Sequence, residues 1–415
     1  MPEDNELTSL RRLIKHQLGN PGSLNTNKLI SNGIDNADTL TIEQFIDNCP
    51  FTTKSEIVLD HQQNPPFGSN LCREAKSYSR LSKTSGTSGE PISWLDTSDD
   101  WSNMLNAWDL IYKTAGLKVG DDVIYFAFSF GPFLGFWTAY EAAARRGFLT
   151  VPGGGLSSEA RIESIIDCGA TVLCCTPTYA IRLGEENADR SETRINRIIV
   201  AGEPGGSIPS IRKRISELWK GAEIIDHHGM TEVGPVTFQS NNDPCTLSLI
   251  PGFHLAEVIG IETDQEVNLG EEGELVLTTL KRSNNALLRY RTGDLVRKSI
   301  SNIDGKEVLS FEGGVLGRID DMVVIRGVNV YPSAIDSVIG EYAEVTEYRV
   351  LIKEERSMKE IEILVNLRSE SKENELITNI EEKLKAVFSL RIPVKNDKND
   401  KFERFEFKSK RWITE

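Results

Sequence analysis

Short apolar runs alternate with amphipathic stretches through the middle of this 415-residue chain, and this alternation constrains the fold more than any other feature. The apolar runs are VIYFAFSF from Val123, LTVP from Leu149, TVLCC from Thr171, RIIVA from Arg197 and EIID from Glu223. The stretches between them have helical periodicity. Strands that alternate with helices form a mostly parallel sheet, so we predict a doubly wound α/β domain with helices on both faces. Ligands bind such sheets at the carboxyl ends of the strands.

The rest of the chain divides by pattern into further sections. Residues 1–80 are interpreted as a helical lead-in without chemistry of its own. Residues 245–315 carry short strands and turns, typical of a small β subdomain. The remainder alternates helix and strand on a smaller scale. Because 415 residues exceed one ordinary core, we predict a large N-terminal domain over 1–319 and a small, mobile α+β lid domain over 320–415.

Composition excludes several classes of protein. A content of 39% apolar and 26% charged residues is that of a soluble globular protein. The formal net charge of −15 argues against a nucleic-acid-coating protein or an anionic-membrane binder. The six cysteines form no C-x-x-C pair, and the chain does not start with a cationic, apolar signal. We therefore expect reduced cysteines and a cytoplasmic location.

One uncharged stretch approaches the length of a membrane span. It runs over residues 123–140, against the roughly 20 residues that cross a bilayer. Gly131-Pro132 interrupts it, so we interpret the stretch as a buried strand followed by a helix packed on it.

A hydroxyl-rich loop over residues 82–89 is the first candidate for chemistry. It carries five hydroxyl residues together with Gly86 and Gly89. Glycines allow close approach to a ligand, and free N–H groups in such a bend form an anion-binding concavity. A polyphosphate fits this description, while a surface turn is the alternative. The spacing of a Walker motif is absent.

Further motifs follow in a fixed order after this TSGTSGEP loop. They are AGEPGG from Ala201, HHGMTEVGP from His227, RYRTGDLV from Arg289, GRIDDMVVIRGVNVYP from Gly317 and ERFEFKSKRW from Glu403. Together they resemble the adenylate-forming superfamily of acyl-CoA synthetases, luciferases and peptide-synthetase adenylation domains. The AGEPG, IRGVNVYP and CGATVLCCTP runs are similar to the phenylacetate–CoA ligase-like branch. The resemblance covers residues from about 80 to 415.

The resemblance implies an activity. Such enzymes activate a carboxylic acid, here expected to be aromatic, with ATP and Mg²⁺, giving an acyl-adenylate and pyrophosphate. They then transfer the acyl group to the thiol of coenzyme A. Loading of a carrier-protein phosphopantetheine and a non-catalytic nucleotide-binding role stay open as alternatives, and so does a homodimer. No nucleic acid or membrane partner is expected.

The resemblance also implies a phosphate site, formed by the loop residues Thr84, Ser85, Gly86, Thr87, Ser88 and Gly89. Glu90 stands where the family has a basic residue, and Lys83 is a candidate to compensate.

An adenine and ribose site is implied at Glu203, Pro204, Gly205, Asp226, His227, His228, Gly229, Asp294 and Arg318. His228 would stack on the base, and Asp294 would accept the ribose hydroxyls. A metal site at the two histidines is the alternative, although adjacent residues point apart.

Catalytic roles are implied for Thr231, Glu232 and Lys408. Thr231 would contact the α-phosphate and Glu232 would hold Mg²⁺, while a helix cap is the alternative for the threonine. Lys408 would stabilise charge on the α-phosphate and pyrophosphate from the lid. Phe407 replaces the family's glycine, Lys410 is the other candidate lysine, and a solvated tail is the alternative.

Three smaller sets complete the implied site. The acyl pocket is expected at Phe128, Phe130, Phe133 and Met230, with Trp137 nearby. Asp320 matches the hinge about which the lid rotates, and Arg326 with Gly327 matches a coenzyme A contact. Some relatives carry a structural zinc. Here only Cys245 and His254 stand as ligands and Gln239 replaces a cysteine, so we predict no zinc.

Overall fold

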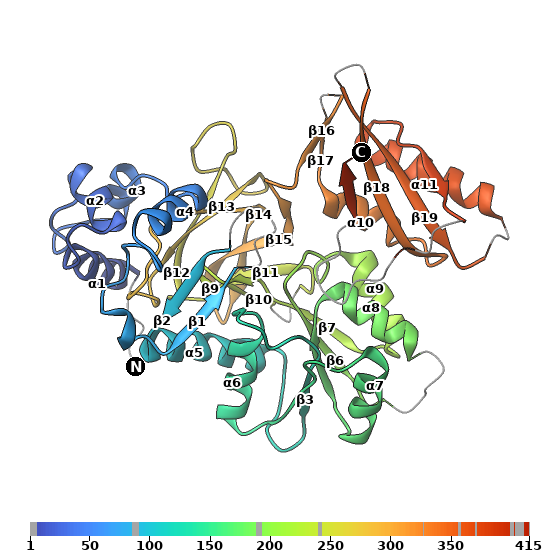
Figure 1. Cartoon of the computed structure of the whole chain (residues 1–415), viewed down its shortest axis with the longest axis horizontal. Coiled ribbons are helices and arrows are strands. Elements are labelled where there is room, and N and C mark those ends of the chain that lie inside the picture. Colours follow the sequence, from blue (N-terminus) through green and yellow to red (C-terminus); the bar gives the residue numbers. More distant parts are fainter. Residues whose placement is uncertain are drawn as a thin grey trace.

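The computed structural model of the chain describes residues 6–84, 91–187, 193–239, 243–326, 328–355, 358–369, 372–398, 402 and 411–414. Figure 1 shows a large part that holds the N-terminal and central sections and a smaller part formed by the C-terminal section. The two parts meet near helices α8, α9 and α10.

A parallel sheet of five strands forms the centre of the large part, which confirms the α/β prediction. The strands lie in the order β4, β3, β5, β6, β7, and every neighbouring pair runs parallel. Their bounds are β3 Val123–Phe126, β4 Leu149–Pro152, β5 Val172–Cys175, β6 Arg197–Val200 and β7 Glu223–Asp226. The helices that alternate with them are α5 Ser98–Thr114, α6 Trp137–Arg146, α7 Ser158–Asp167, α8 Pro177–Glu186 and α9 Pro209–Leu218.

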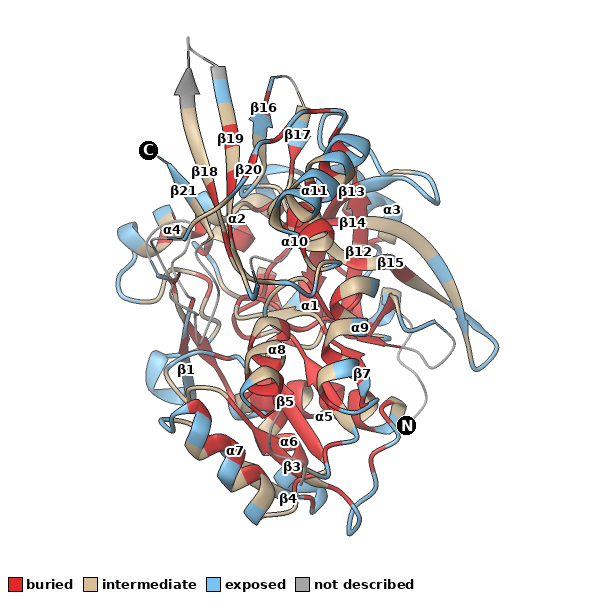
Figure 2. Ribbon diagram, turned by 90° about the vertical axis from the view of Figure 1, so that its right-hand side faces the viewer, coloured by how far each residue is buried: buried red, intermediate tan, exposed pale blue. Residues whose placement is uncertain are grey.

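Successive side chains of these strands enter two separate hydrophobic cores, because they point to opposite faces of the sheet. Phe126, Cys174 and Ile199 pack with α5 and α6 on one face. Tyr125 and Leu173 pack with α7, α8 and α9 on the other. Figure 2 shows buried residues along β5. The sheet therefore presents only its strand ends to a ligand.

The lead-in forms a cluster of short helices on the side of a second sheet. These are α1 Glu6–Leu18, α2 Leu24–Ser31, α3 Ile42–Asn48 and α4 Lys54–Gln63. Thr41 and Thr53 begin α3 and α4 with reciprocal capping boxes. Leu10 and Phe45 share a core with Leu288 next to the second sheet (Figure 1).

The second sheet is antiparallel, as the patterns over 245–315 predict, and its strand order is β10, β11, β15, β14, β13, β12. Its strands are β10 Thr237–Gln239, β11 Thr246–Leu249, β12 His254–Ile259, β13 Glu272–Thr279, β14 Tyr290–Ile303 and β15 Lys306–Arg318. The prediction of short strands is wrong for β14 and β15, which have 14 and 13 residues. The ladder between them continues through register shifts at Leu295–Arg297. Because these shifts interrupt the regular alternation of side chains, the sequence pattern indicates several short strands where the structure has one long hairpin.

Two small hairpins flank the predicted phosphate and metal motifs. The first pairs β1 Arg80–Lys83 with β2 Ser93–Asp96, on either side of residues 85–90. The second pairs β8 Gly229–Met230 with β9 Gly234–Pro235.

The C-terminal section has its own sheet and its own core. Its strand order is β20, β19, β18, β21, and its core includes Ile335, Val350 and Leu384. The elements are β16 Val323–Ile325, β17 Val328–Val330, α10 Pro332–Ile339, β18 Val345–Glu355, β19 Met358–Leu367, α11 Glu373–Phe388, β20 Val394–Asn396 and β21 Trp412–Thr414. No helix among the described residues is long and apolar enough to cross a membrane.

Candidate functional site

A cavity of about 340 Å³ lies where the carboxyl ends of β6 and β7 meet the C-terminal section. The loops after these two strands form one wall, the ends of β14 and β15 contribute Asp294 and Arg318, and α10 and β18 form the facing wall. The predicted residues that line it are Glu203, Pro204, Gly205, Asp226, His227, His228, Gly229, Met230, Asp294 and Arg318. Each predicted adenine or ribose residue thus reaches one cavity.

The loop after β6 is held by its own glutamate. Glu203 accepts a hydrogen bond from the backbone N–H of Thr178 at 2.8 Å, at the start of α8, and a second from the Thr178 hydroxyl. Burial raises the pKa of Glu203, while these hydrogen bonds lower it. Gly205 adopts a φ of +151°, and a Cβ there would come within 2.8 Å of Pro177. The AGEPGG loop therefore lies tightly against the first turn of α8.

The carboxylate of Asp226 braces the neighbouring loop. It accepts from the Ser207 hydroxyl at 2.6 Å and from the backbone N–H of His227 at 2.9 Å. Burial raises the pKa of Asp226, and the Ser207 contact and the charge of Arg212 oppose that rise. Asp226 thus fixes the two loops relative to each other.

The two adjacent histidines have separate environments. Nδ1 of His227 lies 2.7 Å from the carbonyl of Thr237, and its ring packs on Trp108 with 4.5 Å between centroids. Burial lowers the pKa of His227 to about 3. Nε2 of His228 instead lies 3.1 Å from Oδ2 of Asp294. The pair does not converge on one point, and within the described ranges no three His, Cys, Asp or Glu side chains gather around a metal position.

The carboxylate of Asp294 lies between the guanidinium of Arg318 and the imidazole of His228. Nη1 of Arg318 donates to its Oδ1 at 3.0 Å, and His228 approaches its Oδ2. Burial would raise the pKa of Asp294, but the charges and hydrogen bonds of His228 and Arg318 outweigh burial and hold it below its ordinary value. Oδ2 of Asp294 and Nε2 of His228 are buried without an aligned hydrogen-bond partner among the described residues. A ligand hydroxyl is the kind of donor that suits Oδ2 of Asp294.

Arg318 also reaches the predicted hinge. Its Nε and Nη2 donate to Oδ1 and Oδ2 of Asp320 at 3.0 and 3.1 Å. Its Nη1 donates to the carbonyl of Thr292 at 2.8 Å in addition to Asp294. One guanidinium therefore links Asp294 with Asp320.

The Thr231-Glu232 motif lies in the turn between β8 and β9. No helix starts there, so the helix-cap alternative is wrong. Glu232 is buried, and its Oε1 lies 4.0 Å from Nζ of Lys54 at the start of α4. The interpretation of residues 1–80 as lacking chemistry missed this lysine. The TTK run before a helical pattern predicts only a cap and gives no indication of a partner more than a hundred residues away.

The predicted acyl-pocket residues divide between two places. Phe128 and Phe130 pack on each other with 4.6 Å between ring centroids, and they contact Phe136, Trp137 and Tyr140. Phe133 is 44% exposed and Met230 lines the cavity. The backbone N–H of Lys83 donates to the carbonyl of Pro132 at 2.5 Å, which brings this aromatic loop beside the first hairpin.

Several predicted residues lie at or beyond the edge of the described chain. Ser85, Gly86, Thr87, Ser88, Gly89 and Glu90, like Gly327, Phe407, Lys408 and Lys410, lie outside the described residues. Thr84 closes the base of the loop, because its N–H and its hydroxyl both bond to the backbone of Ile92. Arg326 donates to Glu360 at 2.5 Å and is half exposed.

Arg411 is a cavity residue that sequence reasoning missed. It lies in the predicted basic tail but donates to Asp336 at 3.0 Å and Glu347 at 2.7 Å, and its guanidinium lies 4.7 Å from the Tyr348 ring centroid. The KSKRW run contains four candidate polar positions, and only tertiary contacts distinguish this arginine from its neighbours.

The residues considered for zinc have other partners. Oε1 of Gln239 accepts from Arg212 and from the N–H of Asp226, both at 3.0 Å. Nε2 of His254 lies 3.2 Å from the carbonyl of Val233, and Cys245 donates its N–H to Asp243 at 2.9 Å.

The two-part fold, with the cavity at the carboxyl ends of β6 and β7, is that of an adenylate-forming enzyme. The family model described as "AMP-binding enzyme" matches residues 71–281, and that described as "AMP-binding enzyme C-terminal domain" matches residues 327–415. The chain therefore belongs to the AMP-binding enzyme family.

Individual relatives agree with this assignment. A phenylacetate-coenzyme A ligase of Thermus thermophilus is 30% identical over 318 residues, which cover 75% of this chain and 69% of that protein. One of Pseudomonas putida is 28% identical over 316 residues, with the same two coverages. The crystal structure of a 2-hydroxyisobutyryl-CoA ligase in the postadenylation state has a TM-score of 0.90 at 24% identity, over 99% of this chain and 89% of that one. In its thioesterification state the same ligase gives 0.72 over 99% and 88%.

Proposed function

We propose that the chain is an AMP-forming acid–CoA ligase that activates an arylacetic acid of the phenylacetate type. ATP and the acid give an acyl-adenylate and pyrophosphate, and the thiol of coenzyme A then displaces AMP to give the thioester. The convergence of His228, Asp294 and Arg318 on one cavity carries the proposal. The family membership and the phenylacetate–CoA ligase relatives support it.

Asp294 is assigned to the ribose. Its pKa lies below the ordinary value, so it is an anionic acceptor at neutral pH, and its Oδ2 has a buried lone pair to offer. Two ribose hydroxyls could donate to one carboxylate. His228 lies against the same oxygen, and its ring is assigned to the adenine.

Neutralisation of the charge that builds up during adenylation is assigned first to Glu232 and the Mg²⁺ that it would bind. Attack of a carboxylate on the α-phosphorus brings two anions together, so positive groups must be placed in advance. Glu232 is assigned to Mg²⁺, which prefers few carboxylates and retained waters. A buried carboxylate with a lysine 4.0 Å away fits such a site, because the metal can take over the neutralising role of Lys54. The metal would shield the triphosphate charge.

The remaining assignments are proposals of the same kind. The 84–89 loop is assigned to the β- and γ-phosphates, Thr231 to the α-phosphate, and Lys408 to charge that develops during adenylation. Arg326 and Gly327 are assigned to coenzyme A. The lid is proposed to begin at Asp320. Support for that boundary comes from the C-terminal core, whose members begin at Val323.

The test is a panel of acids assayed for pyrophosphate exchange with ATP. Phenylacetate, benzoate, 2-hydroxyisobutyrate, malonate and a medium-chain fatty acid cover the classes of acid that such ligases distinguish by pocket shape. We expect phenylacetate to give the highest kcat/KM. Exchange with an aliphatic acid alone would contradict the aryl assignment, and exchange with none would contradict the ligase assignment.

The same assay tests which thiol accepts the acyl group and whether Lys408 is the catalytic lysine of the lid. Addition of coenzyme A should give a thioester and AMP, whereas product formation only with a phosphopantetheinylated carrier would favour the alternative acceptor. Lys408→Ala should slow adenylation by about a hundredfold or more, as loss of a transition-state charge contact does. Lys410→Ala is the matched control. Equal losses in both variants would contradict the choice of Lys408.

A further inference from the structure

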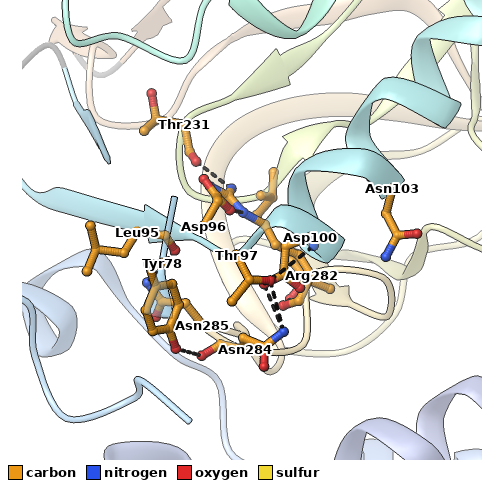
Figure 3. A network of polar contacts seen from close by, with 12 residues as sticks. Tyr78, Leu95, Asp96, Thr97, Asp100, Asn103, Thr231, Arg282, Asn284 and Asn285 are labelled. Atoms are coloured by element: carbon orange, nitrogen blue, oxygen red, sulfur yellow. Dashed lines mark hydrogen bonds and ion pairs between the residues drawn. The ribbon is translucent and has the colours of Figure 1, made fainter. Parts of the chain in front are cut away.

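A fully buried ion pair lies behind the Thr231-Glu232 turn, outside the cavity itself. Nε and Nη2 of Arg282 donate to Oδ1 and Oδ2 of Asp96 at 2.5 and 2.7 Å. Both side chains have no exposed surface. The guanidinium also lies 5.5 Å from the ring centroid of Trp94, two residues before Asp96 on β2. Figure 3 shows Asp96 and Arg282 facing each other across this interior.

The remaining guanidinium nitrogen of Arg282, Nη1, reaches the turn that carries Thr231 and Glu232. Nη1 of Arg282 donates to the backbone carbonyl of Thr231 at 2.6 Å (Figure 3). On the other side of Glu232, the carbonyl of Val233 lies 3.2 Å from Nε2 of His254. The backbone carbonyls of Thr231 and Val233, the residues on either side of Glu232, therefore both contact buried side chains. These contacts restrict the backbone of the turn and hence the direction of the Glu232 carboxylate.

Asp96 connects this turn with the β1–β2 hairpin. It is the last residue of β2 and pairs with Arg80, the first residue of β1, at the end of the hairpin away from residues 85–90. Arg282 itself is fixed, because the next residues are bound to the start of α5. The N–H of Ser283 donates to Asp100 at 2.9 Å, and the amide of Asn284 donates to Asp100 and Thr97 at 3.0 and 3.2 Å.

We propose that Asp96 and Arg282 are positioning residues for adenylation. Their ion pair sets the distance between the β1–β2 hairpin and the turn that carries Glu232, so that the Glu232 carboxylate is held where it can bind the metal. The proposal rests on the proposed function, because it assigns Glu232 to the metal. Removal of a charged pair from water is costly, and a guanidinium that makes two hydrogen bonds to Asp96 and a third to the Thr231 carbonyl is suited to orientation.

The chain contains a matched pair for comparison. Arg289 donates to both oxygens of Glu257 at 3.0 and 2.6 Å, and both residues are buried. Its Nη1 reaches the backbone carbonyls of Ile46 and Cys49 in the lead-in. The two arginines thus share a bidentate carboxylate and a backbone carbonyl, but only Arg282 holds the Thr231-Glu232 turn.

The experiment compares Arg282→Lys with Arg289→Lys in the full-length protein. A lysine keeps the positive charge in each pair and loses the fork that joins carboxylate and carbonyl. The readouts are the Mg²⁺ concentration for half-maximal pyrophosphate exchange, the KM values for ATP and for the acid, and the melting temperature. Mg²⁺-dependent binding of ATP, measured by calorimetry without an acid, gives a readout that does not depend on turnover.

We expect Arg282→Lys to raise the half-maximal Mg²⁺ concentration by about 10- to 100-fold, as loss of an outer-sphere positioning contact does, with the KM of the acid unchanged. Arg289→Lys should lower the melting temperature comparably and leave the Mg²⁺ requirement at the wild-type value. Equal Mg²⁺ requirements in the two variants would overturn the proposal. If either lysine variant fails to fold, Asp96→Asn and Glu257→Gln repeat the comparison with smaller expected shifts.

A failure of the proposed function is distinguishable. Wild-type protein that exchanges pyrophosphate with no acid contradicts the ligase assignment, yet the calorimetric comparison still tests the positioning role. If ATP binding then depends on Mg²⁺ and weakens only in Arg282→Lys, the positioning role stands. If both variants bind like the wild type, it falls.

Discussion

Arg318 donates to both carboxylate oxygens of Asp320, at 3.0 and 3.1 Å, from the last position of β15. The same guanidinium holds Asp294 at 3.0 Å. The residue assigned to the hinge is therefore clamped to the residue assigned to the ribose. A rotation of the lid about Asp320 that moves its side chain must break these contacts, which couples the state of the nucleotide site to the orientation of the lid.

The clamp and the hinge can be separated by two substitutions at one position. Asp320→Ala removes the clamp and keeps backbone freedom, whereas Asp320→Pro removes the clamp and also fixes φ. We expect Asp320→Pro to slow thioester formation about tenfold more than pyrophosphate exchange, since a domain rotation needs a residue that absorbs the φ/ψ change. Single-turnover measurements of both steps provide the check. Equal slowing of the two steps in Asp320→Pro, or the same profile in Asp320→Ala, would count against a hinge at this residue.

A second contact joins the C-terminal section, the proposed lid, to helix α8. Nη2 of Arg368 lies 2.5 Å from Oε1 of Glu185 on α8, and Arg214 reaches the same oxygen at 2.9 Å. Because the Arg368 side chain is 47% exposed, solvent screens this ion pair and its contribution is below about 1 kcal/mol. We expect Arg368→Gln to shift the ratio of lid orientations by about two- to fivefold. Small-angle scattering in the presence of an acyl-adenylate analogue measures this shift.

Arg182→Gln is the control for this contact. It removes an exposed ion pair with Glu186 on the same helix. A lid distribution that is identical in wild type, Arg368→Gln and Arg182→Gln at low salt would show that the Glu185 contact has no role in lid orientation.

The sequence predicts the sheet and the nucleotide loops well for a physical reason. Strands β3, β5, β6 and β7 are largely buried, so they appear as apolar runs, and the AGEPGG and HHGMTEVGP loops follow β6 and β7 at their carboxyl ends. AGEPGG and HHGMTEVGP therefore reach one cavity in the structure, as the pattern predicts.

The parts that escaped prediction depend on contacts between distant segments. Lys54 lies in no unusual local pattern, and most of the large domain separates it in sequence from Glu232. The same holds for Asp96 and Arg282, whose charges look like ordinary surface residues until both are found without any exposed surface. Arg411 stands in a basic run that resembles a solvated tail, and only its contacts with Asp336 and Glu347 distinguish it.

Substitution of Lys54 tests the role of the positive charge beside Glu232. Lys54→Met removes the cation 4.0 Å from Glu232 while it keeps the apolar stem. Once Mg²⁺ neutralises Glu232, the ammonium of Lys54 becomes available to the triphosphate. We therefore expect the KM for ATP to rise about tenfold, because a charge-assisted contact to a phosphate contributes about 1.5 kcal/mol. Lys15→Met, at an exposed pair with Asp38, is the control. A KM for ATP that is unchanged in Lys54→Met would show that this lysine only neutralises Glu232 in the free enzyme.

Two buried histidines should make stability fall as the solution is acidified. Burial lowers the pKa of His227 to about 3 and that of His254 to about 4, from an ordinary value of 6.5. Between pH 6.5 and 4 the unfolded chain therefore binds protons that the folded chain excludes, so the free energy of unfolding decreases as pH falls. Each histidine contributes a slope of up to about 1.4 kcal/mol per pH unit in this window.

Substitutions that keep the hydrogen bonds remove this slope one residue at a time. His254→Gln can still donate toward the carbonyl of Val233, and His227→Asn can still donate to that of Thr237. Urea unfolding between pH 6 and 4.5 should show the slope reduced by about 1.4 kcal/mol per pH unit in each variant and by about twice that in the double variant, since the two sites titrate independently. If both single variants retain the wild-type slope, the histidines are not held neutral by the fold, and the acid sensitivity must come from other groups.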